Sequence, residues 1–302
     1  MMNDCQLSPP TFCGYVALLG RPNVGKSTLM NRLIQKKVSI TSRKPQTTRH
    51  RILGITTAQN IQMIYVDLPG VHPHKGGMMN HYMNKVAMAA IYDVDVIVFV
   101  VEGLVWTALD EFVLQKIASQ KIPVLLAVNK VDKIKDKSVF LPHLQQLSTY
   151  HDFSEIIPIS AKTGVNIESL TQSLIKRIPP GPFLFDTTQT TDRSMQFMAS
   201  EFIREQVFRL CGQELPYSVT VQIEKFQEEE QLYRIAGLII VNKDNHKGMI
   251  IGKKGEKLKE IGTQARLTLE RALQKKVFLQ LWVKVKSKWS EDETILRSLG
   301  YD

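Results

Sequence analysis

The stretch that decides the fold of this chain is Gly20-Arg21-Pro22-Asn23-Val24-Gly25-Lys26-Ser27-Thr28. It matches the pattern G-x-x-x-x-G-K-[ST], follows an apolar run at 15–19 and opens an amphipathic stretch at 26–35. In this setting the glycines let the backbone curl so that several N–H groups point at phosphate oxygens, and the positive end of the helix adds to the attraction. Lys26 would then reach the outer phosphates, and the Ser27 hydroxyl would bind Mg²⁺. The stretch therefore predicts a phosphate-binding loop between a strand and a helix.

Short apolar runs alternate with amphipathic stretches around this loop. Strands are predicted for the runs rich in Val and Ile at 15–19, 61–67, 94–101, 123–128 and 156–158, and helices for stretches such as 26–35, 110–120 and 139–150. This alternation predicts an α/β fold, with a mostly parallel sheet and helices on both of its faces. The short connection between 52–55 and 61–65 predicts an antiparallel pair of strands at one edge.

Three further motifs stand at the ends of predicted strands. They are Asp67-Leu68-Pro69-Gly70, Asn129-Lys130-Val131-Asp132 and Ser160-Ala161-Lys162. Asp67 can hold Mg²⁺ through water, and the Gly70 N–H can meet the terminal phosphate. Open α/β sheets bind their ligands at the carboxyl ends of strands, so the four motifs predict one nucleotide site. We expect its contacts to come from residues 20–28, 67–71, 129–132 and 160–162.

The carboxylate of Asp132 predicts which base is bound. It can accept hydrogen bonds from both N1–H and the exocyclic amino group of guanine, while backbone N–H groups at 160–162 can donate to O6. Adenine would leave this carboxylate unpaired, and polar discrimination of this kind reaches about 10⁴. The expected substrate is GTP, hydrolysed by in-line attack of water, with the protein supplying positioning and charge neutralisation.

The pattern changes near residue 178. Three prolines fall within four positions at 179–182, which no helix or central strand tolerates, and the polar stretch 186–192 follows. Beyond it we predict a helix at 195–210, strands at 218–226, 232–241 and 277–285, and a long helical region at 255–275. The predicted organisation is a GTPase domain at 13–178, a linker at 179–193 and an α+β domain at 194–302.

A second candidate site is Gly252-Lys253-Lys254-Gly255, between a short possible helical turn at 245–250 and the long helical region. In KH domains a G-x-x-G loop lets a nucleic-acid backbone come close, while unpaired bases lie in an adjacent apolar groove. About one such pattern is expected by chance in a chain with 17 glycines. Apolar residues before the loop and lysines within and after it favour RNA binding by a KH domain of type II. The expected RNA contacts are Ile251, Gly252, Lys253, Lys254, Gly255 and Lys257.

The aromatic residues near the last predicted strand allow two interpretations. They are Phe278, Trp282 and Trp289, which stand with Leu281 among Lys284, Lys286 and Lys288. This segment could stack bases on a basic strand. Aromatic residues on a strand more often belong to the core, so we predict core positions.

Charge and composition limit the class of protein. The 302 residues include 39 basic and 29 acidic side chains, a formal net charge of +10, with an isoelectric point of about 9.4. Seven Lys and Arg without an acid fall at 32–51, and thirteen against four acids fall at 243–288. These basic windows predict an anionic partner, either nucleic acid or an acidic membrane surface. The longest apolar run, at 86–92, is far shorter than the about 20 residues of a membrane span. Three cysteines without metal-ligand spacing suit a reducing compartment, so we expect a soluble, cytoplasmic protein.

Residues 15–177 resemble a translation-factor-type GTPase domain. The resemblance implies a Mg²⁺-holding switch threonine within Pro45-Gln46-Thr47-Thr48-Arg49-His50, where Thr48 fits the related bacterial pattern better than Thr47. Many such GTPases orient water with a Gln after the D-x-x-G glycine. That position is Val71 here, so slow intrinsic turnover is expected; His72 could substitute, but we favour a surface role for it.

The resemblance also bears on Asn23. In related GTPases with the pattern G-R-P-N-x-G-K-S, this Asn lies beside the bridging phosphate oxygen, where it can ligate K⁺ in the place of an arginine finger. The alternative is that Asn23 only caps the loop. The catalytic candidates are thus Asn23, Lys26, Thr48 and Gly70, and the candidate Mg²⁺ ligands are Ser27, Thr48 and Asp67.

Taken with the Pro-rich linker and the sequence IIGKKGEKLKEIG at 250–262, these motifs closely resemble the Era family of bacterial GTPases, from about residue 13 to 299. The resemblance implies a monomer that acts in 30S subunit assembly, binds rRNA near its 3′ end and associates peripherally with the inner membrane. Leu68 departs from the family, which usually has Thr there, but its side chain is not expected to touch nucleotide.

GTP and Mg²⁺ are expected to order residues 36–50 and 67–85, and the short, stiff linker at 178–185 to transmit this change to the RNA-binding half. Two alternatives stay open. One is an RNA-binding module whose nucleotide site is a relic, against which stand the intact Lys26, Ser27, Asp67, Asn129 and Asp132. The other is a membrane-surface GTPase, against which stands the lack of an amphipathic anchor or lipidation motif.

Overall fold

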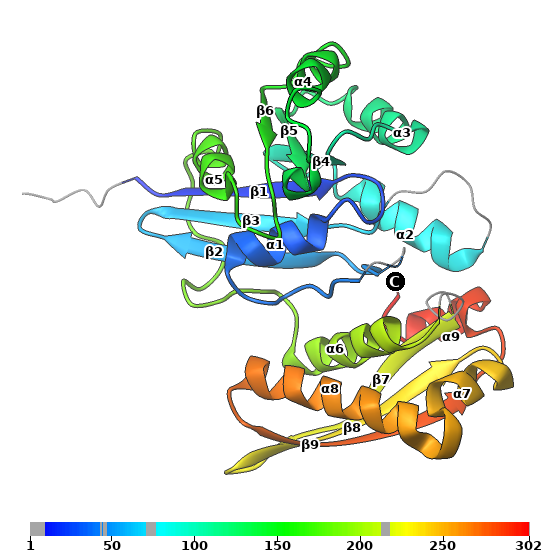
Figure 1. Ribbon diagram of the computed structural model, residues 1–302. Coiled ribbons are helices and arrows are strands. Elements are labelled where there is room, and N and C mark those ends of the chain that lie inside the picture. The colour runs from blue at the N-terminus through cyan, green and yellow to red at the C-terminus, as the bar shows by residue number, and fades with distance from the viewer. Residues whose placement is uncertain (1–9, 43, 45–46, 71–76, 213–217, 302) are drawn as a thin grey trace, which may run out of the picture.

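The computed structural model describes residues 10–42, 44, 47–70, 77–212 and 218–301 (Figure 1). Its strands form two separate sheets, one of six strands and one of three. The first sheet and its helices make up the N-terminal half, and the elements after residue 193 make up the C-terminal half, which Figure 1 shows beneath it. Among these described residues, no helix is both long enough and apolar enough to cross a membrane.

The sheet of the N-terminal half has the order β2-β3-β1-β4-β5-β6. Its strands are β1 (Phe12–Leu19), β2 (Ile52–Ala58), β3 (Ile61–Asp67), β4 (Val96–Glu102), β5 (Val124–Asn129) and β6 (Glu155–Pro158). Strand β2 runs antiparallel to β3 at the edge, and every other pairing is parallel. The predicted mostly parallel sheet with an antiparallel edge pair is confirmed.

Helices cover both faces of this sheet. They are α1 (Lys26–Ile34), α2 (Met78–Ala89), α3 (Ala108–Ile117), α4 (Phe140–Ser148) and α5 (Ile167–Ile175). Because side chains alternate along a strand, Val16 and Leu18 of β1 pack with the residues of α1 and α5, whereas Ala17 and Leu19 pack with those of α3 and α4. Each face therefore has its own apolar core, and the loops at the strand ends are left to build a site.

The C-terminal half has the order α6 (Met195–Leu210), β7 (Val219–Glu228), β8 (Leu232–Val241), α7 (Asp244–Ile251), α8 (Glu256–Leu273), β9 (Lys276–Val285) and α9 (Glu293–Ser298). Strands β7 and β8 are antiparallel, and β9 is parallel to β8. Helices α6 and α8 lie on one face of this sheet (Figure 1). This is the expected type II KH arrangement, with one helix before both strands.

The prediction that Phe278, Trp282 and Trp289 are core residues is wrong for the first two, which lie on β9. Phe278 and Trp282 are 45% and 46% exposed, because they point to the sheet face that α6 and α8 do not cover. Leu281 points the other way into the core. Trp289, beyond the strand, is fully buried, and its indole N–H donates to the Ser218 carbonyl at 3.0 Å.

The connecting segment after α5 is attached to the first sheet. The Cys13 N–H donates to the Pro179 carbonyl at 3.1 Å, and the Ile55 N–H donates to the Thr190 carbonyl at 3.0 Å. Gln62 of β3 donates to the Phe185 carbonyl at 2.8 Å. The segment therefore belongs to the surface of the N-terminal half, and direct contacts between the halves lie elsewhere.

Candidate functional site

The loop after β1 requires glycine at two of its positions. Gly20 and Gly25 have φ angles of 145° and 108°. A Cβ at Gly20 would stand 2.3 Å from the Val100 carbonyl oxygen, and one at Gly25 would stand 2.3 Å from the Asn129 side chain. The loop can therefore curl tightly against β4 and β5 before α1 begins at Lys26.

Lys26 lies inside this loop. Its ammonium donates to the carbonyls of Gly20 at 2.8 Å and Arg21 at 3.1 Å. Burial lowers the pKa of Lys26 to about 8, although the nearby Asp67 carboxylate opposes the shift. A buried ammonium of this kind gains from an anion, so the geometry favours a phosphate ligand.

Three oxygen-bearing side chains meet beside Lys26. The Ser27 hydroxyl donates to Oδ2 of Asp67 at 2.6 Å and lies 2.9 Å from the Thr48 hydroxyl, which in turn lies 3.4 Å from the same Oδ2. Asp67 is fully buried, and burial raises its pKa while these hydroxyls oppose the rise. Its Oδ1 has no hydrogen-bond partner among the described residues. An unsatisfied carboxylate oxygen among hydroxyls fits a hard divalent cation.

The structure separates the two candidate switch threonines. Thr48 reaches Ser27 and Asp67, whereas the Thr47 hydroxyl lies 2.7 Å from the Ser42 hydroxyl and donates to the Lys44 carbonyl. The geometry therefore places Thr48 at the candidate metal position.

Asn129 joins three of the predicted motifs. Its amide nitrogen donates to the Val24 carbonyl at 2.7 Å, and its side-chain oxygen accepts from the backbone N–H groups of Lys130 and Ala161 at 2.8 and 2.9 Å. Asp132 accepts a hydrogen bond from the Ser160 hydroxyl at 2.6 Å. The motif residues thus orient one another into a pocket wall before any base enters.

A cavity of about 1070 Å³ lies between these motifs. The predicted residues that line it are Pro22, Asn23, Gly25, Lys26, Ser27, Thr28, Thr48, Gly70, Asn129, Lys130, Asp132, Ala161 and Lys162. The predicted residues outside its lining are Gly20, Arg21, Val24, Asp67, Leu68, Pro69, Val131 and Ser160. Val71 and His72 lie outside the described residues.

Some of these non-lining residues have clear structural positions. The Arg21 guanidinium donates to Asp110 of α3 at 3.0 Å. Val24 and Leu68 are fully buried in the two cores of the N-terminal half. The side chains of Arg21, Val24 and Leu68 therefore pack in the structure around the cavity without lining it.

Sequence reasoning missed that the C-terminal half also lines this cavity, through Phe208 and Arg209 of α6. It also assigned the basic window at 32–51 to an anionic partner. In the structure Lys37 contacts Glu205, and Arg49 donates to the Val219 carbonyl at 2.8 Å, so both cations bind the C-terminal half. The pattern of charged and apolar residues along the chain does not predict contacts between residues that lie this far apart in the sequence.

The G-x-x-G loop joins α7 to α8. Gly252 and Gly255 have φ angles of 70° and 81°, and a Cβ at Gly252 would stand 2.6 Å from that of Lys257. Lys253 and Lys254 are exposed, Ile251 is half-buried, and Lys257 pairs with Glu260 at 3.1 Å. The turn therefore presents two lysines that have no ion pair with any residue the structure describes, beside glycines whose backbone a ligand can approach closely.

Known proteins match both halves. Residues 15–130 match the family described as 50S ribosome-binding GTPase, and residues 214–290 match the KH domain family. GTPase Era of Actinobacillus pleuropneumoniae is 53% identical over 99% of this chain and 99% of its own length, and GTPase Era of Coxiella burnetii is 53% identical over 97% and 99%.

Two solved structures share the whole architecture, each with a TM-score of 0.92, 39% identity and coverage of 96% of this chain and 99% of the other. One is a variant of Aquifex aeolicus Era bound to GDP·AlF4⁻, and the other is Era in complex with MgGDPNP and nucleotides 1506–1542 of 16S ribosomal RNA. Because the 53% identity extends over nearly the full length of both chains and the fold is shared, the chain belongs to the Era family of GTPases.

Proposed function

We propose that this GTPase binds and hydrolyses GTP in the cavity between the four motifs, binds small-subunit rRNA near its 3′ end through the KH half, and acts in assembly of the 30S subunit. The observation that carries the proposal is the meeting of Ser27, Thr48 and Asp67 beside Lys26 at one end of a cavity that has Asp132 in its wall. The domain limits 13–178, 179–193 and 194–302 are part of the proposal.

Different residues of the cavity are proposed to bind the base, the phosphates and Mg²⁺. Asp132, oriented by Ser160, accepts from the guanine edge, while the N–H groups of the loop and the Lys26 ammonium neutralise phosphate oxygens. Ser27, Thr48 and Asp67 would hold Mg²⁺, whose charge would offset that of the β- and γ-phosphate oxygens. The Era complex with MgGDPNP supports this assignment. Gly70 lines the cavity and is proposed to donate its N–H to the terminal phosphate.

The proposal for K⁺ rests on the position of Asn23. Its backbone is left-handed, with φ 67°, and its carbonyl accepts from the Lys130 ammonium at 2.7 Å, so the loop holds the residue at the cavity wall. A side-chain oxygen there can ligate a monovalent cation near the bridging phosphate oxygen. Equal GTP turnover in K⁺ and Na⁺ at matched ionic strength would leave Asn23 as a loop cap only.

For RNA, the proposed contacts are Gly252, Gly255 and the lysines around them, with Ile251 facing the bases. The Era structure that contains nucleotides 1506–1542 of 16S ribosomal RNA supports this partner. A cytoplasmic location, a monomeric state and peripheral association with the inner membrane stay predictions, and liposome flotation with and without competing RNA would test the last of these.

The test of the RNA assignment is the double substitution Lys253→Glu and Lys254→Glu. Both side chains are exposed, so the fold should persist, while repulsion from phosphates should weaken rRNA binding at least about tenfold. GTP affinity should stay unchanged, because the nucleotide cavity is lined by other residues. Loss of both affinities would indicate misfolding, and intact rRNA binding would contradict the assignment.

A further inference from the structure

Helix α6 of the C-terminal half holds a segment of the N-terminal half that borders the nucleotide cavity. We call the described residues 37–42, 44 and 47–49 the switch segment, because Thr48 belongs to it; in Figure 1 residues 37–42 run between α1 and α6. Ile40 is fully buried in the core of the C-terminal half. Near the other end of the segment, the Thr47 carbonyl accepts from Arg204 of α6 at 2.6 Å. The described part of the switch segment therefore belongs to the N-terminal half by sequence but packs against the C-terminal half.

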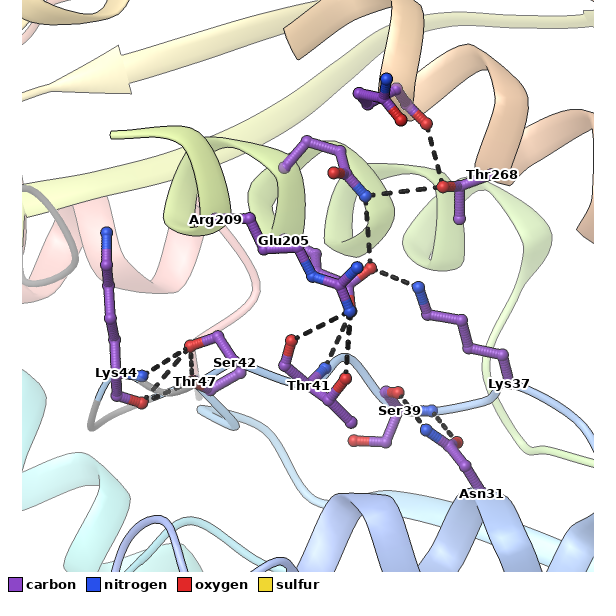
Figure 2. Close-up of polar contacts among 12 residues, drawn as sticks. Asn31, Lys37, Ser39, Thr41, Ser42, Lys44, Thr47, Glu205, Arg209 and Thr268 are labelled. Atoms are coloured by element: carbon purple, nitrogen blue, oxygen red, sulfur yellow. Dashed lines mark hydrogen bonds and ion pairs between the residues drawn. The ribbon is translucent and has the colours of Figure 1, made fainter. Parts of the chain in front are cut away.

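Glu205 of α6 is a buried acidic residue that contacts the switch segment at Lys37 and Thr41 (Figure 2). Its side chain is 0% exposed, and its Oε1 accepts from the Thr41 N–H at 3.0 Å and from Arg209 at 2.8 Å, while its Oε2 contacts the Lys37 ammonium. A buried carboxylate is costly unless it is fully paired, so these partners hold one another firmly. Glu205 therefore fixes the backbone of the switch segment at Thr41.

Two residues before Thr41, the same segment is attached to the nucleotide site. Ser39 donates to Oδ2 of Asp67 at 2.7 Å, and Asn31 of α1 accepts from the Ser39 N–H at 2.9 Å and donates to its carbonyl at 2.7 Å. Thr41 itself lines the nucleotide cavity. The three residues from Ser39 to Thr41 therefore connect the Glu205 carboxylate of the C-terminal half with the Asp67 carboxylate at the candidate metal position.

We propose that Glu205 is a positioning residue for GTP hydrolysis, supplied by the KH half. Its carboxylate holds Thr41, which precedes Ser42, whose hydroxyl lies 2.7 Å from that of Thr47, the neighbour of Thr48. Through Thr41 it thus helps to keep Ser39 and Thr48 against Asp67. Among the residues that the structure describes, Glu205 contacts Lys37, Thr41, Gln206 and Arg209 and neither Asp132 nor Ser160 of the base-binding end. Its loss should therefore lower the fraction of molecules with Thr48 in place and leave recognition of guanine intact. This inference rests on the proposed function of the cavity.

The test compares Glu205→Ala and Glu205→Gln with Glu270→Ala in the full-length chain. Glu270 of α8 is a matched control, because it too accepts from a backbone N–H (Val277, 3.2 Å) and pairs with an arginine (Arg266, 3.0 Å), but within the C-terminal half. Glu205→Ala should lower kcat at least about tenfold, with KM for GTP and the affinity for GDP changed less than about threefold. Glu205→Gln keeps an acceptor for Thr41 and should retain more activity, and Glu270→Ala should match the unsubstituted protein.

The results distinguish a failure of the proposed GTPase function from a failure of the proposed role of Glu205. An unsubstituted protein that turns over no GTP would overturn the proposed function. Turnover in that protein, with a kcat for Glu205→Ala equal to or above that of Glu270→Ala, would overturn the role of Glu205. If thermal unfolding shows that Glu205→Ala does not fold, Glu205→Gln decides: faster amide hydrogen exchange across 37–42 together with a lower kcat supports the role, and unchanged exchange contradicts it.

Discussion

At the residue scale, Lys26 shows how the loop prepares a charge for its ligand. Its ammonium is held by two backbone carbonyls, and burial lowers its pKa to about 8. The pattern G-x-x-x-x-G-K-[ST] was sufficient to predict its position, because the loop is local and its geometry depends on neighbouring glycines. The pKa follows from packing against β4 and β5, which the pattern does not contain.

The lowered pKa of Lys26 predicts that GTP affinity depends on pH. Below about pH 8 the free protein carries the ammonium that binds phosphate; above it the proton is lost, so affinity should fall, by up to about tenfold per pH unit. Calorimetric titrations between about pH 7 and about pH 9 measure this slope. Lys26→Met should bind more weakly and without the slope, and an equal slope in this variant would assign the titration to another group.

At the element scale, β9 shows why the prediction of core positions for Phe278 and Trp282 was wrong. Phe278 and Trp282 alternate with inward residues as in any strand, so periodicity alone could not say whether helices cover one face of the sheet or both. The three-stranded sheet has α6 and α8 on one face, which leaves these two side chains half exposed. Helices α2, α5 and α9 were not predicted, although every strand of both sheets was located.

The burial of the tryptophans predicts unequal costs of substitution. Trp289→Ala should lower the free energy of unfolding by about 3–5 kcal/mol, because it empties a fully buried site and removes the indole N–H that donates to the Ser218 carbonyl. Trp282→Ala should change it by less than about 1 kcal/mol, since the side chain is 46% exposed. Urea unfolding of the two variants checks this, and equal losses would place Trp282 in a packed environment.

At the scale of the whole molecule, the two halves meet through side chains that are far apart in the sequence. Coupling through the linker stays a prediction; the linker is attached to the first sheet, and direct contacts between the switch segment and α6 come from Arg204 and Glu205. The nucleotide site could be predicted because its motifs follow consecutive strands of one sheet. The part of the cavity wall that α6 supplies could not be predicted, because it depends on how the two halves pack against each other, and the sequence pattern of each half does not contain this.

This arrangement predicts that rRNA affinity depends on the nucleotide bound. A ligand that orders Thr48 acts on the switch segment, and this segment is packed on α6 of the KH half, so the two sites should be coupled by about fivefold or more in affinity. Binding of an rRNA fragment from the 3′ end, measured with a GTP analogue, with GDP and without nucleotide, gives the coupling directly. Three identical affinities would show that the halves act independently.

The central claim is that one cavity binds a triphosphate through its loop and selects guanine through Asp132. Isothermal titration calorimetry of the full-length chain in Mg²⁺ buffer tests it most directly. We expect saturable heat with GTP and none with ATP at the same concentration. The absence of heat with GTP, or equal binding of ATP, would contradict the account.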